Sequence, residues 1–322
     1  MARWLLLIEK VEAVARVLSP SATASIFFSR PLTHDALLRI NLHIHFVTRI
    51  IFPPLPPIQI EFAMLSRLLF STIAVTALSL PAAFAQETAT IKAQFVYGGS
   101  AFDPAALVPD KDVEFCGKHK LVNERLLINE SNNGIKNVVF QVYTGRGGSK
   151  LPESPASPET VTLANSQCRF EPRVVLLQVG DTLKITNPDP IGHNANLNFF
   201  ANTAQNLLIP PGAEKEIPIE KPEPGIVRVD CNIHPWMTAQ VVALDHPFAA
   251  VSDEDGMIEI KGVPAGEKLV FRINHEAADS GIKEVAIDGK TETLKKNLIE
   301  VMVKPGVNDL GKITIPAGTL KP

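Results

Sequence analysis

The sequence predicts an all-β protein made of two successive small sandwiches, and three observations support this prediction. From Ala89 onward, short apolar or alternating runs rich in β-branched residues follow one another, a pattern typical of strands. Clusters of glycine, proline and asparagine interrupt these runs at short intervals, as turns do. No long stretch shows the periodicity of an amphipathic helix. Many short strands at this spacing indicate a sandwich or a barrel.

The first predicted sandwich spans residues 86–244. Turn signals such as Asn132-Asn133-Gly134 and Pro210-Pro211-Gly212 separate its elements. The stretch from Gly145 to Thr160, rich in glycine, serine and proline, is expected to be a solvated loop inside this domain. Strands are expected at Thr90–Tyr97, Leu126–Ile128, Val138–Tyr143, Val174–Val179, Thr182–Thr186, Glu216–Ile219, Ile226–Val229 and Gln240–Leu244.

The second predicted sandwich covers residues 245–322 and begins near Asp245-His246-Pro247. It contains neither a cysteine nor a helical pattern, so its stability is expected to come from sheet packing alone. Its strands are expected at Ala249–Val251, Met257–Ile260, Lys268–Ile273, Leu298–Val303 and Gly311–Ile315.

Residues 64–85 have the three parts of a secretory signal peptide. Met64 to Arg67 form a short basic start, Leu68 to Leu80 form an uncharged apolar run, and Ala83-Phe84-Ala85 forms an A-x-A cleavage site. The apolar run is shorter than the roughly 20 residues of a membrane-spanning helix. We therefore expect cleavage and a periplasmic or secreted protein with no membrane span, the alternative being an uncleaved membrane anchor.

The position of this signal peptide suggests that translation starts at Met64. Signal peptides stand at the start of a protein, so we interpret residues 1–63 as a non-native upstream extension. Seven of the 31 basic residues and four of the 34 acidic residues precede residue 86, which leaves residues 86–322 with a charge of about −6. No basic stretch could follow a phosphate backbone, and this excludes nucleic acid as an expected partner.

Three cysteines, Cys116, Cys168 and Cys231, all lie in the exported part. Disulfides persist in an oxidising compartment, and an odd number of cysteines leaves one thiol over. A disulfide between Cys116 and Cys168 would leave Cys231 free to bind a metal as a thiolate. The alternative is a structural disulfide between Cys231 and one of the other two.

A motif after the expected strand Ile226–Val229 carries the ligand types of a copper site. It places Cys231, His234 and Met237 at intervals of three residues, and His193 follows the expected strand Thr182–Thr186 as a second histidine. Two imidazoles, one thiolate and a weak axial thioether form the ligand set of blue copper centres. Zinc accepts the same nitrogen and sulfur ligands, but a thioether suits it poorly. Met237 could instead be a core residue.

Two neighbours of these residues are expected to support the site. The stretch from Gly180 to Asn194, followed by Cys231-x-x-His234-x-x-Met237, resembles the plastocyanin and amicyanin branch of the cupredoxins over residues 165–243. The resemblance implies a Greek-key sandwich with one copper ion and gives Asn194 the role of tying the two ligand loops together. Trp236 is expected to pack beside the loop and shield the site from water.

The resemblance also implies what the copper would do. His234 would lie near the surface in a patch with Pro235, and electrons would pass through the edge of its ring. The chain from residue 86 onward also resembles bacterial proteins described as methylamine-utilisation or plastocyanin-like. Ala239 departs from the cupredoxin pattern, which commonly has glycine there.

The second domain resembles the carboxypeptidase-regulatory and transthyretin-like sandwiches. Two stretches carry this resemblance, Asp253-Glu254-Asp255-Gly256 and Gly262-Val263-Pro264-Ala265-Gly266. Such a domain would serve a structural or docking role. Its acidic turn is either solvated or a calcium ligand.

The expected function is therefore transfer of single electrons to or from a redox protein, such as a cytochrome c or a dehydrogenase. Four protein ligands leave no open position for a substrate, so the protein is not expected to be an enzyme. The alternatives are a non-redox copper carrier and a cell-surface binding protein with a structural metal.

Overall fold

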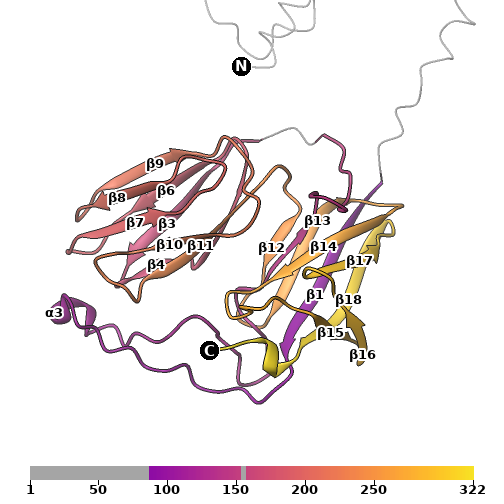
Figure 1. The fold of residues 1–322 in the computed structure, drawn as a ribbon, viewed down its shortest axis with the longest axis horizontal. Helices are drawn as coiled ribbons and strands as arrows, with labels where there is room; N and C mark the ends of the chain where they lie inside the picture. Colours follow the sequence, from indigo (N-terminus) through magenta and orange to yellow (C-terminus); the bar gives the residue numbers. More distant parts are fainter. Residues whose placement is uncertain (1–86, 154–156) are drawn as a thin grey trace, which may run out of the picture. The chain divides into compact units, whose positions relative to one another are not determined.

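A computed structural model describes residues 87–153 and 157–322, and these residues are all-β apart from two short helices (Figure 1). The all-β prediction is confirmed. The predicted signal peptide and the predicted upstream extension lie outside the described residues. No helix in the described part of the chain is both long and apolar enough to cross a membrane.

One sandwich, which we call the ligand sandwich, comprises residues 160–244. Its two sheets have the strand orders β5-β11-β10-β7-β8 and β4-β3-β6-β9. The pairs β5–β11 and β3–β6 are parallel. The strands are β3 (Thr160–Ser166), β4 (Arg169–Glu171), β5 (Val174–Gln178), β6 (Thr182–Thr186), β7 (His193–Leu197), β8 (Gln205–Ile209), β9 (Glu214–Pro218), β10 (Val227–Asp230) and β11 (Thr238–Leu244).

Buried and partly exposed residues alternate along the strands, and the buried ones form the core of the ligand sandwich. In β6, Leu183 and Ile185 are fully buried between three partly exposed polar residues, because successive side chains of a strand point to opposite faces. The strand β11 is buried at nearly every position, as expected for a strand with neighbours on both sides, here β5 and β10. This core contains Cys231 and Met237.

The second sandwich has sheets of order β13-β1-β18-β15-β16 and β12-β2-β14-β17. A separate core fills it, with the stacked rings of Phe140 and Phe271 at its centre. Its strands are β1 (Thr88–Tyr97), β2 (Val139–Val142), β12 (Ala249–Val251), β13 (Met257–Pro264), β14 (Lys268–Asn274), β15 (Glu284–Ile287), β16 (Lys290–Thr293), β17 (Leu298–Met302) and β18 (Gly306–Ile315), followed by the 3-10 helix η2 (Ala317–Thr319).

The strands β1 and β2 correct the predicted domain boundary. We expected both in the first domain, but β1 pairs with β13 and β18, and β2 pairs with β12 and β14. The alternating buried residues of β1 identify it as a strand, but nothing in a local pattern specifies which distant strand becomes its neighbour. The ligand sandwich is consequently inserted between β2 and β12 of the second sandwich.

The connecting segment, residues 98–138, joins β1 to β2. It contains the helix α3 (Val113–Cys116) and an isolated bridge between Ala106 and Val122. The expected strand Leu126–Ile128 is reduced to one bridge from Ile128 to Ile135. The described residues of the expected loop, 145–153 and 157–160, contain no strand apart from Thr160, which is the first residue of β3.

Candidate metal centre

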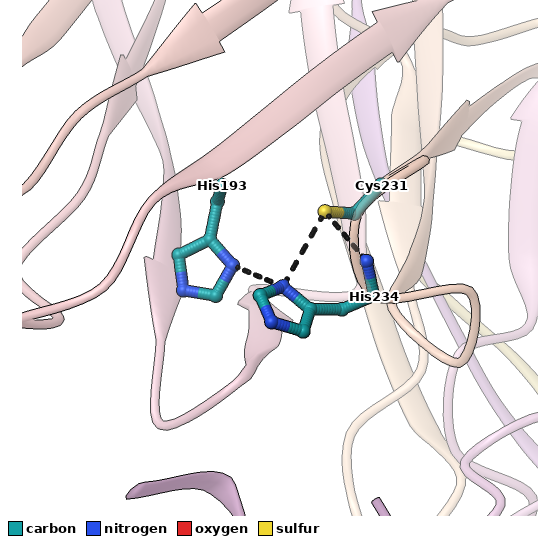
Figure 2. A group of neighbouring side chains, drawn as sticks. All are labelled: His193, Cys231 and His234. Atoms are coloured by element: carbon teal, nitrogen blue, oxygen red, sulfur yellow. Dashed lines mark hydrogen bonds between the residues drawn. The ribbon is translucent and has the colours of Figure 1, made fainter. Parts of the chain in front are cut away.

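His193, Cys231 and His234 come together in the ligand sandwich (Figure 2). One donor atom from each lies within 4.8 Å of the other two. The Nδ1 atoms of the two histidines are 3.0 Å apart, and the Cys231 Sγ lies 3.8 Å from the His234 Nδ1. All three side chains are buried, with at most 1% of their surface exposed.

The strands explain why these residues meet. His193 is the first residue of β7, where we expected a loop, and Cys231 follows directly after β10. Because β10 pairs with both β7 and β11, the sheet places the two ligand-bearing segments next to each other. The ligand loop, residues 231–237, then connects β10 to β11 across this end of the sheet.

Hydrogen bonds within the ligand loop hold it in a tight turn. The Met237 N–H donates to the His234 carbonyl oxygen over 2.9 Å, and the Cys231 N–H donates to the Met237 carbonyl oxygen over 3.1 Å. The His234 N–H also points to the Cys231 Sγ, 3.4 Å away. Met237 is 1% exposed and belongs to the same buried cluster as Cys231.

Asn194 joins the ligand loop to β7. Its Oδ1 accepts hydrogen bonds from the N–H groups of Asn232 and Ile233, over 2.7 and 3.2 Å, and lies 3.5 Å from the Cys231 Sγ. Its Nδ2 donates to Asn206 on the neighbouring strand β8. These are the contacts that a residue tying the two ligand segments together would make.

Two carboxylates that sequence reasoning missed hold the outer edges of the histidine rings. The Asp189 Oδ2 lies 3.0 Å from the His193 Nε2, and the Asp112 Oδ2 lies 2.8 Å from the His234 Nε2. Asp189 stands four residues before His193, so this spacing could have suggested it. Asp112 is 122 positions from His234, and no local pattern connects them.

These carboxylates determine the protonation of the two Nδ1 atoms, which face each other inside the centre. A carboxylate accepts hydrogen bonds, so each Nε2 carries a proton and each neutral ring presents a lone pair at Nδ1. Two such lone pairs facing each other at 3.0 Å repel unless a cation, either a proton or a metal ion, lies between them. The inner side of the site therefore favours positive charge.

The ionisable groups of the centre respond to the same surroundings. Burial raises the pKa of the Cys231 thiol, but its hydrogen-bonding contacts with His193, His234 and the backbone outweigh burial and lower this pKa to about 6. Burial lowers the pKa of His234, but its hydrogen bonds with Cys231 and Asp112 outweigh burial, so this pKa is raised. A thiol with a lowered pKa readily becomes the thiolate that binds metals.

The disulfide between Cys116 and Cys168 is confirmed, and Cys231 is a free, buried cysteine. Cys168 also receives a hydrogen bond at its carbonyl oxygen from the indole Nε1 of Trp236, over 3.0 Å. The Trp236 ring lies 5.1 Å from the His234 ring, centre to centre. Trp236 is thus half-buried and contacts both Cys168 and a ring of the centre.

The expectation that His234 lies near the surface is wrong. Its side chain is 0% exposed, although the neighbouring Pro235 is exposed. The reason is Asp112, which the connecting segment brings against the outer edge of the ring. The segment is in turn attached to the ligand sandwich by the disulfide.

The other histidines of the described chain and the acidic turn make contacts outside this centre. His246 and His275 are buried in turns, where each Nδ1 accepts an N–H from the residue two positions later. His119 packs against the ring of Phe115. In the acidic turn of the second sandwich, the Asp255 Oδ1 accepts hydrogen bonds from the side-chain amides of Asn129 and Asn132.

Comparison with known proteins finds partial similarity to solved copper proteins. A Cu-containing nitrite reductase from Thermus scotoductus is 21% identical, with a TM-score of 0.25, and the match covers 30% of this chain and 25% of that one. A reduced amicyanin mutant is 18% identical over 26% of this chain and 81% of its own, with a TM-score of 0.24. A purple cupredoxin from Nitrosopumilus maritimus is 20% identical over 26% of this chain and 97% of its own, with a TM-score of 0.22. No protein-family model and no curated protein matches the chain.

Proposed function

We propose that the ligand sandwich holds one copper ion in a type 1 (blue) site, and that the protein transfers single electrons between redox partners. The observation that carries this proposal is the buried group of two facing imidazole Nδ1 atoms and one thiol with a lowered pKa. Their Nδ1 and Sγ atoms would be the ligands, with Met237 as a fourth, weaker ligand.

The chemistry of the donor set favours copper over zinc. A thiolate and a thioether are soft ligands that suit Cu(I), and imidazole suits both oxidation states. Structural zinc sites are usually completed by a fourth cysteine or histidine. Among the residues that the structure describes, no fourth histidine, cysteine or carboxylate completes this group of possible ligands.

When bound, the copper would supply a one-electron couple between Cu(II) and Cu(I). The protein would hold the ligands still and exclude water. His193 and Cys231 stand at strand ends, the ligand loop is closed by its own hydrogen bonds, and Asn194 fastens that loop to β7. A site whose ligands move little between oxidation states is suited to electron transfer rather than to binding a substrate. We therefore propose that the protein is not an enzyme.

The partner would be a redox protein in the same compartment, such as a cytochrome c or a dehydrogenase. Because His234 is covered, a hydrogen-bonded route from its ring to the surface runs through Asp112, whose side chain is 41% exposed. We propose that the partner docks over this part of the connecting segment. The disulfide fits an exported, periplasmic or secreted protein.

Visible absorption and electron paramagnetic resonance of the Cu(II)-loaded protein test this function. We expect an intense thiolate-to-copper band with narrow copper hyperfine splitting, both lost in Cys231→Ala. Met237→Leu should alter the spectrum and the reduction potential, whereas Met257→Leu, a matched change in the second sandwich, should leave both unchanged. A colourless protein that binds Cu(I) would indicate a carrier instead. A protein that takes up only zinc would indicate a structural metal.

A further inference from the structure

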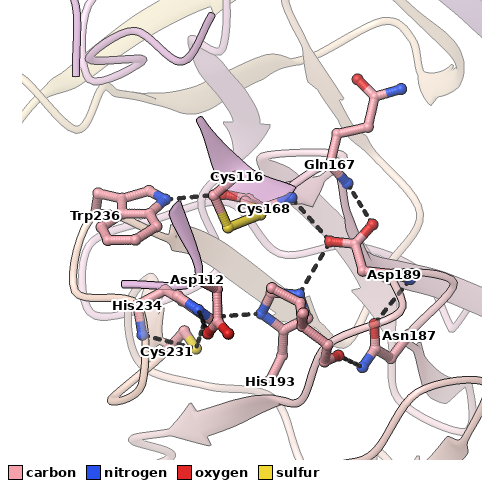
Figure 3. Close-up of a disulfide and its surroundings, with 11 residues drawn as sticks. Asp112, Cys116, Gln167, Cys168, Asn187, Asp189, His193, Cys231, His234 and Trp236 are labelled. Carbon is pink, nitrogen blue, oxygen red and sulfur yellow. Dashed lines mark hydrogen bonds and ion pairs between the residues drawn. A yellow bond between two sulfur atoms is a disulfide. The ribbon is translucent and has the colours of Figure 1, made fainter. Parts of the chain in front are cut away.

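The disulfide lies near the two carboxylates that contact the histidine rings (Figure 3). On one side, the Cys168 N–H donates to the Asp189 Oδ2 over 2.8 Å, and the same oxygen lies 3.0 Å from the His193 Nε2. The Gln167 N–H donates to the other oxygen of Asp189 over 2.7 Å. Asp189 is 5% exposed, so the backbone next to Cys168 fixes its orientation.

On the other side, Cys116 ends the short helix α3, which begins directly after Asp112. The N–H groups of Phe115 and Cys116 donate to the Asp112 carbonyl oxygen, each over 2.9 Å. Asp112 is in the N-cap position, but its side chain makes no capping hydrogen bond and reaches His234 instead. Its φ of 45° is left-handed, an unfavourable conformation for a residue with a side chain.

The helix cannot fix Asp112 by itself. It has four residues, one turn, and helices this short are unstable without tertiary contacts. The covalent contact at its end is the disulfide to Cys168, and both cysteines are fully buried. The unfavourable backbone at Asp112 therefore depends on an attachment only four residues away.

We propose that Asp112 and Asp189 are positioning residues for His234 and His193, and that the Cys116–Cys168 disulfide holds both carboxylates against the rings. This inference rests on the proposed metal centre and identifies the groups that hold its two histidine rings at Nε2. Each carboxylate keeps the proton on Nε2 and the Nδ1 lone pair directed inward. The disulfide acts on both rings, whereas each carboxylate acts on one.

Nitrogen NMR of the histidine rings in the metal-free protein tests this assignment directly. Asp112→Asn should change the tautomer or the Nε2 proton exchange of His234 alone, and Asp189→Asn should do so for His193 alone. Cys116→Ala/Cys168→Ala should change both rings. Alanine is chosen because serine would bury two hydroxyl groups at fully buried positions. Loss of such outer contacts typically lowers metal affinity about 10- to 100-fold, and copper titration should show this loss in all three variants.

Leu183→Ala is the control, because it lowers stability by removing a fully buried side chain of β6, a strand of the other sheet from β7 and β10. Its ring signals should equal those of the wild type. Unchanged rings in a folded Cys116→Ala/Cys168→Ala variant would overturn the role of the disulfide. If that variant does not fold, the two Asp→Asn variants decide, and unchanged rings in both would overturn the proposal. The ring signals require no metal, so they test the positioning even if copper spectroscopy rejects a blue site.

Discussion

His193 and His234 face each other through Nδ1 atoms that are 3.0 Å apart, although 41 positions separate them in the sequence. Each ring is held from outside by a carboxylate at Nε2. The two Nδ1 lone pairs thus face each other, and a cation between them would relieve their repulsion. The Cys231 thiol lies beside them. In the proposed metal centre, this relationship would make the free energy of unfolding depend on bound metal.

Metal binding should stabilise the folded protein through this pair. A metal at 100 times its dissociation constant adds about 2.7 kcal/mol to the free energy of unfolding. Thermal unfolding with and without Cu(I) should show this gain in the wild type and lose it in His193→Ala and His234→Ala. The control His246→Asn changes a buried histidine outside the centre and should keep the metal-dependent gain. An equal gain in all four proteins would place the metal elsewhere.

Removing Asn194 should loosen the ligand loop. Asn194→Ala leaves the N–H groups of Asn232 and Ile233 without their acceptor, and we expect a loss of about 1 to 3 kcal/mol in denaturant unfolding. Asn206→Ala removes only the exposed partner of the Asn194 amide. That control should lower the free energy of unfolding by less than about 1 kcal/mol. Equal losses in the two variants would contradict the role of Asn194 in holding the ligand loop.

The ligand motif could be read from the sequence because its information is local. Cys231, His234 and Met237 lie within one seven-residue loop after a strand, so spacing alone predicts that they meet. His193 could be added because a strand precedes it, although it opens β7 rather than lying in a loop. The all-β class was likewise predictable from alternation, for example in β6.

What could not be predicted depends on contacts between distant segments. Asp112 reaches His234 from the connecting segment, which a disulfide attaches to Cys168. The strand β1 was recognised from its alternating residues, yet its partners β13 and β18 lie more than 150 residues later. A period-two pattern specifies which face of a strand is buried, but leaves its neighbours undetermined.

Glu223 should stabilise the ligand sandwich by holding the loop that follows β7. Its carboxylate accepts the N–H groups of Phe200, Ala201 and Asn202 over 2.9 to 3.1 Å and is 7% exposed. Glu223→Gln directs an amide group at these donors, and we expect a loss of about 2 kcal/mol in denaturant unfolding. Glu220→Gln, an exposed control, should change stability by less than about 0.5 kcal/mol. Matching losses would contradict the assigned role.

The second sandwich should lose stability in acid through His275. Burial lowers the pKa of this histidine from 6.5 to about 4, with Arg173 and Arg125 adding to the effect and the Lys136 carbonyl opposing it. The neutral ring is suited to its contacts, since Nδ1 accepts the Ala277 N–H and Nε2 donates to Lys136.

The sign of this pH dependence follows from the lowered pKa. Between pH 6.5 and pH 4 the unfolded chain binds a proton at His275 that the folded protein does not, so the free energy of unfolding falls as the pH falls. The full difference is about 3 kcal/mol. Urea unfolding of the wild type and of His275→Asn across this range measures it. The variant should show a correspondingly shallower slope, and parallel curves would mean that His275 is protonated without cost in the folded state.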